Sequence, residues 1–409
     1  MAGEWRDTTL GEFVTLQRGH DLTDDERLPG KVPVVGAAGQ NGFHDKAMAK
    51  GPGVVVGRSG ASFGQVHFCD KDFWPHNTGL YVTDFRGNDP CFAFYFLKAL
   101  DFSRYNSGSA QPSLNRNFIY PIEVQVPPPA EQRAIAHILG TLDDKIELNR
   151  RMNETLEAMA RALFKSWFVD FDPVRAKAEG RDPGLPRYLA DLFPDSFQDS
   201  ELGEIPKGWN VGRFGDVVEQ LRDQENPLLS PEALYHHFSL PAFDEGQSPK
   251  AEYGESIKSQ KSRVPAGVVL LSKLNPEIER VWLVDVRPPE RAVCSTEFLV
   301  LGARPPFTRG FVYCLARSPL FRQQIVGLVT GTSKSHQRAQ ADSILNLSVI
   351  VPPSSIVVVF DRLAEGPLAR TLECRRESRT LSALRDALLP KLISGELRVR
   401  DVQSVVEML

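Results

Sequence analysis

Two stretches of the chain carry apolar residues at the helical spacing of three or four positions. The first runs from Glu131 to about Phe171 and contains no proline and a single glycine, Gly140. The second runs from Ser354 to about Ile393. Because apolar residues at this period line one face of a helix, each stretch predicts a long amphipathic helix. About forty helical residues make a rod of roughly 60 Å.

We expect the two predicted helices to pack against each other antiparallel, as a coiled-coil-like spacer. Asn149 and Asn153 interrupt the first apolar stripe, and a buried Asn in such a seam fixes register at some cost in stability. Gly366-Pro367 predicts a break in the second helix. The stripe residues are Ile135, Leu139, Leu142, Ile146, Leu156, Met159 and Leu163 in the first helix and Leu368, Leu372, Leu381, Leu384, Leu388 and Leu392 in the second.

The chain that precedes each helix is one copy of a long internal repeat. Matched blocks occur in unbroken order and pair Trp5 with Trp209, Gly53 with Gly267, Asn77 with Ser295, Phe92 with Phe311, Ser107 with Thr330 and Pro127 with Pro352. The offset grows steadily along the chain, as small insertions in one of two copies of a domain would produce. A repeat of this length therefore predicts two homologous domains.

Each copy has the pattern of a mixed α/β domain. Aliphatic runs at 54–56 and 268–271 predict buried strands, and 122–126 and 347–351 predict strands that end at a Pro pair. The amphipathic segments 92–101 and 311–317 predict short helices. The predicted fold class is therefore α+β, with two homologous globular domains separated by a pair of long antiparallel helices. Between the copies, 170–209 is rich in Pro, Asp and Gly and predicts an extended linker.

Composition places this chain among ordinary globular proteins. Its formal net charge of −4 means that a nucleic-acid site would need locally concentrated cations. The scattered cysteines favour reduced thiols over disulfides or zinc. With no signal peptide or membrane span in the sequence, we expect a cytoplasmic protein. These cysteines are Cys69, Cys91, Cys294, Cys314 and Cys374.

The glycines and prolines do not form the motifs of a catalytic site. The spacing of Gly57, Gly60 and Gly64 matches neither a dinucleotide nor a phosphate-binding loop. An adenine methyltransferase needs an Asn/Asp-Pro-Pro-aromatic tetrapeptide, and neither VPPP at Val126 nor NPEI at Asn275 supplies it. The carboxylates are dispersed, unlike those of a metal nuclease. We therefore expect no catalysis, no metal and no bound cofactor.

Several long strings resemble the specificity subunits of type I restriction-modification systems. They are PVVGAAGQNGFHDK from Pro33, GVVVGRSGASFG from Gly53, VPPPAEQRAIAHIL from Val126, LDDKIELNRRMNETLE from Leu142, FKSWFVDFDPV from Phe164, SELGEIPKGW from Ser200 and LLPKLISGEL from Leu388. The resemblance covers nearly the whole chain and includes the order of its parts. One departure is the start of the second helix, SSIVVVFDRLAE from Ser354, where the family usually has a Gln-rich echo of EQRAIA.

The resemblance implies a division of labour within a larger complex. Each α/β domain would be a target-recognition domain that reads one half of a bipartite double-stranded DNA sequence, and the helices would set the gap. Two modification subunits that methylate adenine and two restriction subunits with translocase and nuclease activity would bind the chain. Those partners, not this chain, would use S-adenosylmethionine, ATP and magnesium. The implied parts are domain 1 at 1–130, a central helix at 131–171, a linker at 172–208, domain 2 at 209–353, a helical region at 354–397 and a tail at 398–409.

Candidate DNA-reading residues are the hydrogen-bonding side chains on loops of each copy, because base edges are read by donors and acceptors held rigidly. The loops GSAQPSLNR and GTSKSHQR are favoured because they occupy corresponding places in the repeat. In the first copy the candidates are Arg18, His20, Arg58, Ser59, Ser62, His76, Asn77, Thr78, Ser107, Ser109, Gln111, Ser113, Asn115 and Arg116. In the second they are Lys258, Lys261, Arg263, Lys273, Asn275, Thr332, Ser333, Lys334, Ser335, His336, Gln337 and Arg338.

Other interpretations remain open at this point. Solvated loops with turn-forming Ser and Asn would show the same residues without binding DNA. A two-headed scaffold for other proteins would suit the net charge of −4. A self-sufficient methyltransferase or nuclease is disfavoured because the motifs described above are missing from the sequence.

Overall fold

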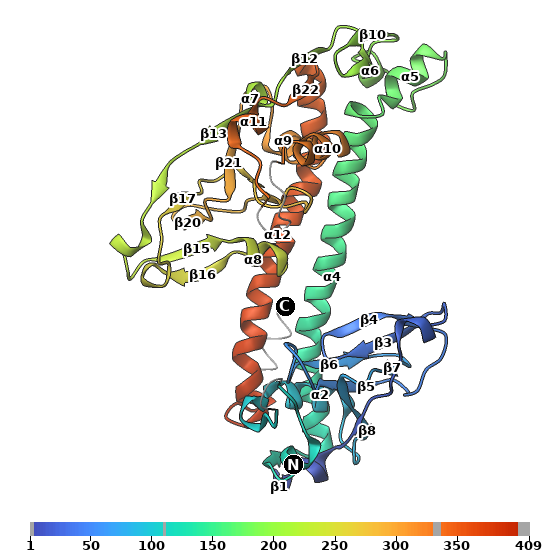
Figure 1. Cartoon of the computed structure of the whole chain (residues 1–409), viewed down its shortest axis with the longest axis vertical. Coiled ribbons are helices and arrows are strands. Elements are labelled where there is room, and N and C mark those ends of the chain that lie inside the picture. The colour runs from blue at the N-terminus through green and yellow to red at the C-terminus, as the bar shows by residue number, and fades with distance from the viewer. Residues whose placement is uncertain (1–3, 109–111, 330–336, 400–409) are drawn as a thin grey trace. The chain divides into compact units, whose positions relative to one another are not determined.

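The computed structural model describes residues 4–108, 112–329 and 337–399. The chain divides into two compact units, one formed by Met1–Glu147 with Thr380–Leu409 and the other by Leu148–Arg379. Each unit holds one α/β domain together with part of each of two long helices, α4 (Pro129–Phe168) and α12 (Ser354–Ile393) (Figure 1). We call the α/β part of the first unit the first head and that of the second unit the second head.

The first head contains three small sheets. A four-stranded sheet has the order β2 (Thr15–Arg18), β8 (Gly79–Asp84), β5 (Gly53–Gly57) and β6 (Val66–Cys69). A three-stranded sheet has the order β4 (Gly39–His44), β3 (Val32–Gly36) and β7 (Trp74–Pro75), and β1 (Arg6–Thr9) pairs with β9 (Glu123–Val126). The helices are α1 (Leu10–Phe13), α2 (Pro90–Ala99) and α3 (Arg116–Ile119), with 3-10 turns η1 (Asp24–Glu26) and η2 (Phe102–Tyr105).

The second head repeats this topology. Its four-stranded sheet has the order β13 (Val218–Leu221), β21 (Phe298–Ala303), β18 (Val269–Ser272) and β19 (Val281–Leu283), and β12 (Asn210–Arg213) pairs with β22 (Ser348–Val351). A five-stranded sheet has the order β14 (Gln224–Glu225), β17 (Lys261–Arg263), β20 (Arg291–Cys294), β15 (Leu234–Phe238) and β16 (Lys250–Tyr253). The helices are α7 (Phe214–Val217), α8 (Leu240–Asp244), α9 (Arg309–Ala316), α10 (Pro319–Gly327) and α11 (Ala341–Leu345), with 3-10 turns η3 (Pro227–Leu229) and η4 (Gly254–Ser256).

The strand pairings confirm the predicted duplication. The order β2-β8-β5-β6 in the first head becomes β13-β21-β18-β19 in the second, with antiparallel neighbours in both. The parallel pair β3–β7 has its counterpart in β15–β20, and the antiparallel pair β3–β4 in β15–β16. Together with the long helix pair, this topology is the predicted α+β fold class.

The central strand of each head is covered on both faces, which explains its unbroken apolar sequence. Side chains alternate between the faces of a strand. In β5, Val54 and Val56 therefore join one core while Val55 joins another. In β18, Leu271 and Leu270 divide between two cores in the same way. A strand buried on both faces shows a continuous hydrophobic run instead of alternation.

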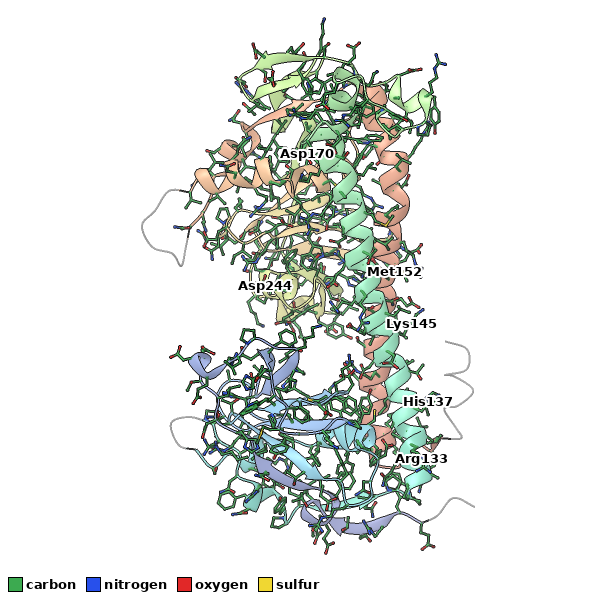
Figure 2. All side chains as sticks on the ribbon, turned by 90° about the vertical axis from the view of Figure 1, so that its right-hand side faces the viewer. Arg133, His137, Lys145, Met152, Asp170 and Asp244 are labelled. Atoms are coloured by element: carbon green, nitrogen blue, oxygen red, sulfur yellow. The ribbon has the colours of Figure 1, made fainter. Side chains whose placement is uncertain are left out.

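Helices α4 and α12 pack antiparallel within each unit. In the first unit, Glu131 pairs with Arg398 and Asp143 with Arg385, so the partner's number falls as the number along α4 rises. In the second unit, Asn149 donates to Glu377, and Phe164 contacts Phe360. The opposite face of α4 is exposed, and Arg133 and His137 lie along it (Figure 2).

Most of the predicted stripe lies between the helices and the heads, with one exception. Met159 is 56% exposed, and the neighbouring Ala160 is buried in its place. The prediction for Met159 is wrong because Ala160 and Phe164, four residues apart, lie on the face of α4 that packs against the core in its last turns, and Met159 lies off that face. The buried members are Ile135, Leu139, Leu142, Asn149, Leu368, Leu372, Leu381 and Leu392, whereas Ile146, Leu156, Leu163, Leu384 and Leu388 are half-buried.

The predicted break at Gly366-Pro367 is wrong, because α12 continues through both residues. Proline has no N–H to donate to the carbonyl four residues earlier, here that of Leu363. Leu363 is 46% exposed, so water can bond that carbonyl. Thr371 Oγ1 also donates to the carbonyl of Pro367 at 3.1 Å. The helix thus accommodates Pro367 in a turn where Leu363 and Gly366 are exposed.

The segment at 172–208 is not extended, contrary to the prediction from its composition. It forms α5 (Asp172–Ala178), α6 (Arg187–Ala190) and a hairpin of β10 (Phe197–Ser200) and β11 (Gly203–Pro206). Phe193 and Ile205 are buried in the core of the second unit. The apolar residues spaced between its prolines and glycines supply the contacts that fold it.

The described residues hold no disulfide and no cluster of ligands suited to a metal. The cysteines are thiols, and no group of three or more His, Cys, Asp or Glu side chains converges among the described residues. Within the same residues, no helix is long and apolar enough to cross a membrane.

Candidate nucleic-acid interface

The ends of β2 and β5 enclose a polar hollow of about 600 Å³ in the first head. Seven predicted residues line it: Arg18, His20, Arg58, Ser107, Ser113, Asn115 and Arg116. The structure thus brings together side chains that are up to about a hundred positions apart in the sequence. Gln17, Asp21 and Asn117 line the same hollow and were not predicted.

Arg58 lies one residue past the end of β5 in a fixed backbone frame. Its N–H donates to the carbonyl of Thr78 at 2.8 Å, and its carbonyl accepts from Leu114 N at 2.7 Å. Gly60 N donates to the carbonyl of Pro112 at 3.3 Å, with Gly60 at φ +83°. These bonds tie the Gly-rich turn to the loop before α3, so the turn and the favoured loop of the first head belong to one surface.

Arg18 and Asp21 form an ion pair at the edge of the hollow. The two charged groups are 3.1 Å apart, and both side chains are more than half exposed. A hydrogen bond from Asn77, helped by the nearby Arg18 guanidinium, holds the pKa of Asp21 below its ordinary value. Asp21 is therefore ionised at neutral pH and offsets part of the positive charge of Arg18.

The predicted histidines and Thr78 are engaged within the protein. His20 Nε2 lies 3.3 Å from the Tyr81 hydroxyl, and His76 Nδ1 lies 3.0 Å from Thr78 Oγ1. Thr78 Oγ1 also accepts from Ala37 N at 3.1 Å. These half-buried groups are better suited to shaping the edge of the hollow than to contacting a ligand directly.

The remaining first-head candidates differ in how freely their side chains are held. Arg116 is exposed but donates through Nη1 to the carbonyl of Leu16 at 2.8 Å. Asn115 caps α3 by accepting from Asn117 N. Ser59 and Ser113 face each other across an isolated bridge, and Ser62 is half-buried in the turn. Ser109 and Gln111 lie outside the described residues.

An equivalent hollow of about 360 Å³ lies in the second head. It is lined by Gln220, Arg222, Ser262, Lys273, Thr296, Ala341 and Asp342, among others. Lys273 N donates to the carbonyl of Glu297 at 2.9 Å, and its carbonyl accepts from Ala339 N at 3.0 Å. Asn275 N donates to the carbonyl of Gln337 at 2.8 Å, with Asn275 at φ +47°. Lys273 and Asn275 therefore correspond to Arg58 and Gly60.

The second-head candidates do not all gather at this hollow. Arg263 lines a separate hollow of about 830 Å³, together with Asp223, Glu225 and Glu290. Lys258 is exposed and donates to the carbonyl of Glu255, whereas Lys261 is half-buried on β17. Neighbouring side chains of a strand point to opposite faces. Ser262 of β17 therefore lines the hollow of about 360 Å³, and its neighbour Arg263 lines the hollow of about 830 Å³.

The loop before α11 is only partly described. Gln337 holds the turn at Asn275 through its carbonyl, and the exposed Arg338 pairs with Glu297 at 2.6 Å. Thr332, Ser333, Lys334, Ser335 and His336 lie outside the described residues.

Two residues of the second head were missed, although the repeat contains the signal for them. Trp5 of the first copy matches Trp209 of the second, and the same offset pairs Arg18 with Arg222. Pro127 matches Pro352, and that offset pairs Asn115 with Gln340. Arg222 lies 3.6 Å from Asp342, and Gln340 stands at the N-cap position of α11 as Asn115 does at that of α3, although only Asn115 caps its helix through a side-chain hydrogen bond. Carrying each first-head residue through the nearest matched block would have found both.

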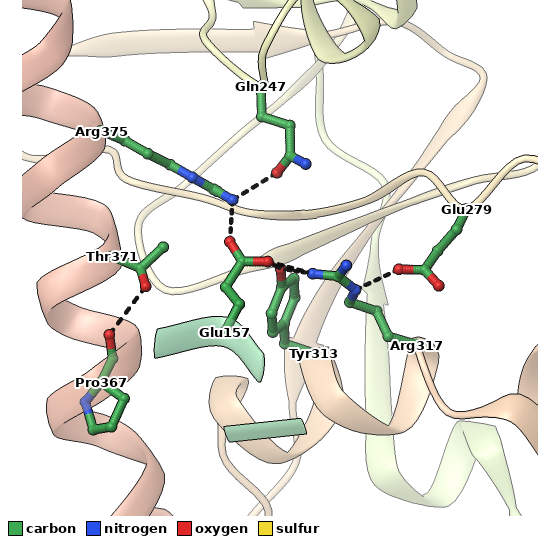
Figure 3. A network of polar contacts seen from close by, with 8 residues as sticks. All are labelled: Glu157, Gln247, Glu279, Tyr313, Arg317, Pro367, Thr371 and Arg375. Carbon is green, nitrogen blue, oxygen red and sulfur yellow. Dashed lines mark hydrogen bonds and ion pairs between the residues drawn. The ribbon is translucent and has the colours of Figure 1, made fainter. Parts of the chain in front are cut away.

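A buried polar network joins the second head to the helices. Glu157 of α4 accepts from Tyr313 of α9 at 3.0 Å and from Arg317 at 2.6 Å, and it also pairs with Arg375 of α12 (Figure 3). Burial opposes ionisation of Glu157, but Arg375 and Arg317 outweigh it and hold its pKa below the ordinary value. The carboxylate therefore remains charged between two arginines.

The first head is joined to the helices in the same manner. The Tyr95 hydroxyl of α2 donates to Asp143 of α4 at 2.7 Å, and Asp143 pairs with Arg385 of α12 at 2.5 Å. In both units, a tyrosine from the head, an acid from α4 and an arginine from α12 meet. Burial, with the hydrogen bond to Asp143, raises the pKa of Tyr95, so its hydroxyl keeps its proton.

Known proteins share this sequence and architecture. The profile of the type I restriction modification DNA specificity domain matches residues 2–158. The specificity subunit of the type I restriction enzyme MjaIX from Methanocaldococcus jannaschii is 27% identical over 323 residues, which cover 76% of this chain and 70% of the relative. The specificity subunit of the HindI enzyme from Haemophilus influenzae is 25% identical over 425 residues, with 86% and 88% covered.

One solved structure shares the fold over nearly the full length. The crystal structure of the type I restriction-modification S subunit from M. genitalium matches with a TM-score of 0.62 at 14% identity, covering 95% of this chain and 96% of that one. Fold and repeat together define a two-headed protein built on a helix pair. Residues 2–158 match the type I restriction modification DNA specificity domain, and over most of its length the chain is similar to specificity subunits of type I restriction enzymes, which are non-catalytic components of those systems.

Proposed function

We propose that the chain recognises a bipartite double-stranded DNA sequence, one half by each head. The observation that carries this proposal is the pair of equivalent hollows, each with a cation directly past the central strand and hydrogen-bonding side chains around it. Base edges are read by such donors and acceptors, while phosphates are contacted by cations. The net charge of −4 requires that a nucleic-acid site concentrate positive charge locally, and the cations at these hollows do so.

We further propose that the helix pair fixes the gap between the two half-sequences and carries the partner subunits. Two modification subunits that methylate adenine and two restriction subunits would assemble on the chain. The partners would supply S-adenosylmethionine, ATP and magnesium, and this chain would bind none of them. The polar networks at Glu157 and Asp143 support this role, because they tie each head to both helices within its unit.

Co-expression tests the proposal directly. The chain is produced with its cognate modification subunit in a host without other adenine methylation, and methylated adenines are mapped across the genome. We expect one interrupted sequence with a constant gap at the methylated sites. Methylated sites with no common sequence, or none at all despite a stable complex, would contradict the proposal and favour a protein scaffold. The purified chain alone is expected neither to methylate DNA nor to nick it with magnesium.

A further inference from the structure

The two hollows can be compared position by position because the same backbone bonds frame both. Arg58 corresponds to Lys273 through the bonds at its N–H and carbonyl, and Ser59 to Leu274 and Ser113 to Arg338 through equivalent isolated bridges. Gly57 N donates to Gln65 O at 2.7 Å, as Ser272 N donates to Arg280 O at 3.0 Å. This correspondence is structural and does not depend on side-chain similarity.

Between the two hollows, the charge of the side chain is retained at one corresponding position and the charge or polarity changes at the positions beside it. A cation stands at Arg58 and at Lys273. The flanking positions differ in charge or polarity: Ser59 corresponds to Leu274, Ser113 to Arg338 and Arg116 to Ala341. Two heads that read different half-sequences must differ where they touch bases. They are free to agree where they touch phosphates, since phosphates are alike at every step of DNA.

Arg58 and Lys273 are also left without an internal counter-ion among the described residues; Arg116 shares this in the first head, but Ala341 stands at its position in the second. Neither Arg58 nor Lys273 forms an ion pair with any residue that the structure describes, and both are half-buried at the hollow. In contrast, Arg18, Arg222 and Arg338 each face a carboxylate, from Asp21, Asp342 and Glu297 respectively. A held cation without an internal counter-ion favours an external anion.

We propose that Arg58 and Lys273 are equivalent phosphate anchors that place DNA in the same way on each head, while the flanking positions that differ read the bases. This inference rests on the proposed function and adds a division of roles within each hollow. Arginine and lysine can both serve at such an anchor, because each brings one positive charge to the phosphate, lysine as a point charge and arginine through its planar guanidinium.

Salt titration of DNA binding tests the anchors. The complex with the cognate modification subunit is titrated with a duplex of the mapped sequence and with an unrelated duplex, over a range of salt. Arg58→Ala and Lys273→Ala are each expected to weaken binding to both duplexes about tenfold, the loss of one charge-assisted hydrogen bond. The slope of log K against log salt should fall by about 1 for each lost contact. The methylated sequence should stay unchanged.

Matched variants separate the anchor from general loss of charge or of folding. Arg58→Lys and Lys273→Arg should bind with the wild-type salt slope. Lys71→Ala removes an exposed cation near the opposite end of β5, beside Gly51, and should leave the slope unchanged. A changed methylated sequence in Arg58→Ala or Lys273→Ala, or an unchanged salt slope, would overturn the inference. If the wild-type complex itself shows no sequence preference, the proposed function fails first, and the two failures are thereby distinguished.

Discussion

Replacing Glu157 by alanine should destabilise the second unit far more than replacing any exposed acid of α4. The Glu157 side chain is 12% exposed, and the arginines that it pairs with, Arg317 and Arg375, are 12% and 14% exposed. Alanine would leave these two cations buried without their shared carboxylate. Removing one partner of a buried ion pair typically costs about 3–5 kcal/mol. For a unit of this size, that lowers the midpoint of thermal unfolding by roughly 6–20 °C.

The matched control is Glu154→Ala, one turn earlier on α4. Glu154 pairs with Arg150, and both side chains are more than half exposed. An exposed pair of this kind contributes well under about 1 kcal/mol. Urea unfolding should be followed together with hydrogen exchange of the α9 segment, which localises the loss to the second head. Equal effects of the two substitutions would refute the reasoning.

The pH dependence of Glu157→Gln gives an independent check. Because the pKa of Glu157 is lowered in the folded state, its charge stabilises the protein above the unfolded value of about 4.3. That stabilisation is lost as the pH falls through the lower folded pKa. The stability difference between wild type and Glu157→Gln should therefore be full at neutral pH and shrink below about pH 4. A difference that stays constant down to pH 3 would contradict the ionised network.

Three further predictions follow from single contacts. Tyr95→Phe removes the hydrogen bond to Asp143 and should lower the stability of the first unit by about 1–3 kcal/mol in urea unfolding, without changing secondary structure. Gly366→Ala, where an added Cβ meets open space, should stabilise α12 by about 1 kcal/mol. Pro367→Ala should stabilise it by at least as much, because it restores a helix N–H. A loss of thermal stability in either variant would contradict the continuous helix. Burial raises the pKa of Cys69, Cys294 and Cys314 to about 12, so these thiols should resist iodoacetamide in the native protein at pH 8 and react once it is unfolded in urea.

The overall architecture, two repeated heads and a pair of long helices, was the most predictable part of this protein. The repeat and the two helical stripes predicted the paired heads and the helix pair, because duplicated domains and helical periods leave signals over many residues. Local predictions were weaker where a single residue decides the outcome. The stripe placed Met159 in the core although Ala160 lies there, and Gly366-Pro367 predicted a break that solvent exposure makes unnecessary.

The candidate site was predictable in part for a physical reason. Residues just past the central strands, Arg58 and Lys273, were found because a strand followed by a turn is visible in sequence. Arg222 was missed because no turn signal surrounds it, although the offset between the two copies pairs it with Arg18. Arg263 was grouped with the wrong neighbours, since the face of an isolated short strand cannot be read from its own sequence.

The measurement that tests the central claim most directly is a reciprocal exchange at one equivalent position of the two heads. Ser113→Arg alters the first head and Arg338→Ser alters the second, and the methylated adenines are mapped for each variant with the cognate modification subunit. The account predicts that each substitution changes one half of the methylated sequence, a different half in each case, with the gap unchanged. If either substitution changed both halves or the gap, the two heads would not read DNA independently, and the account would be wrong.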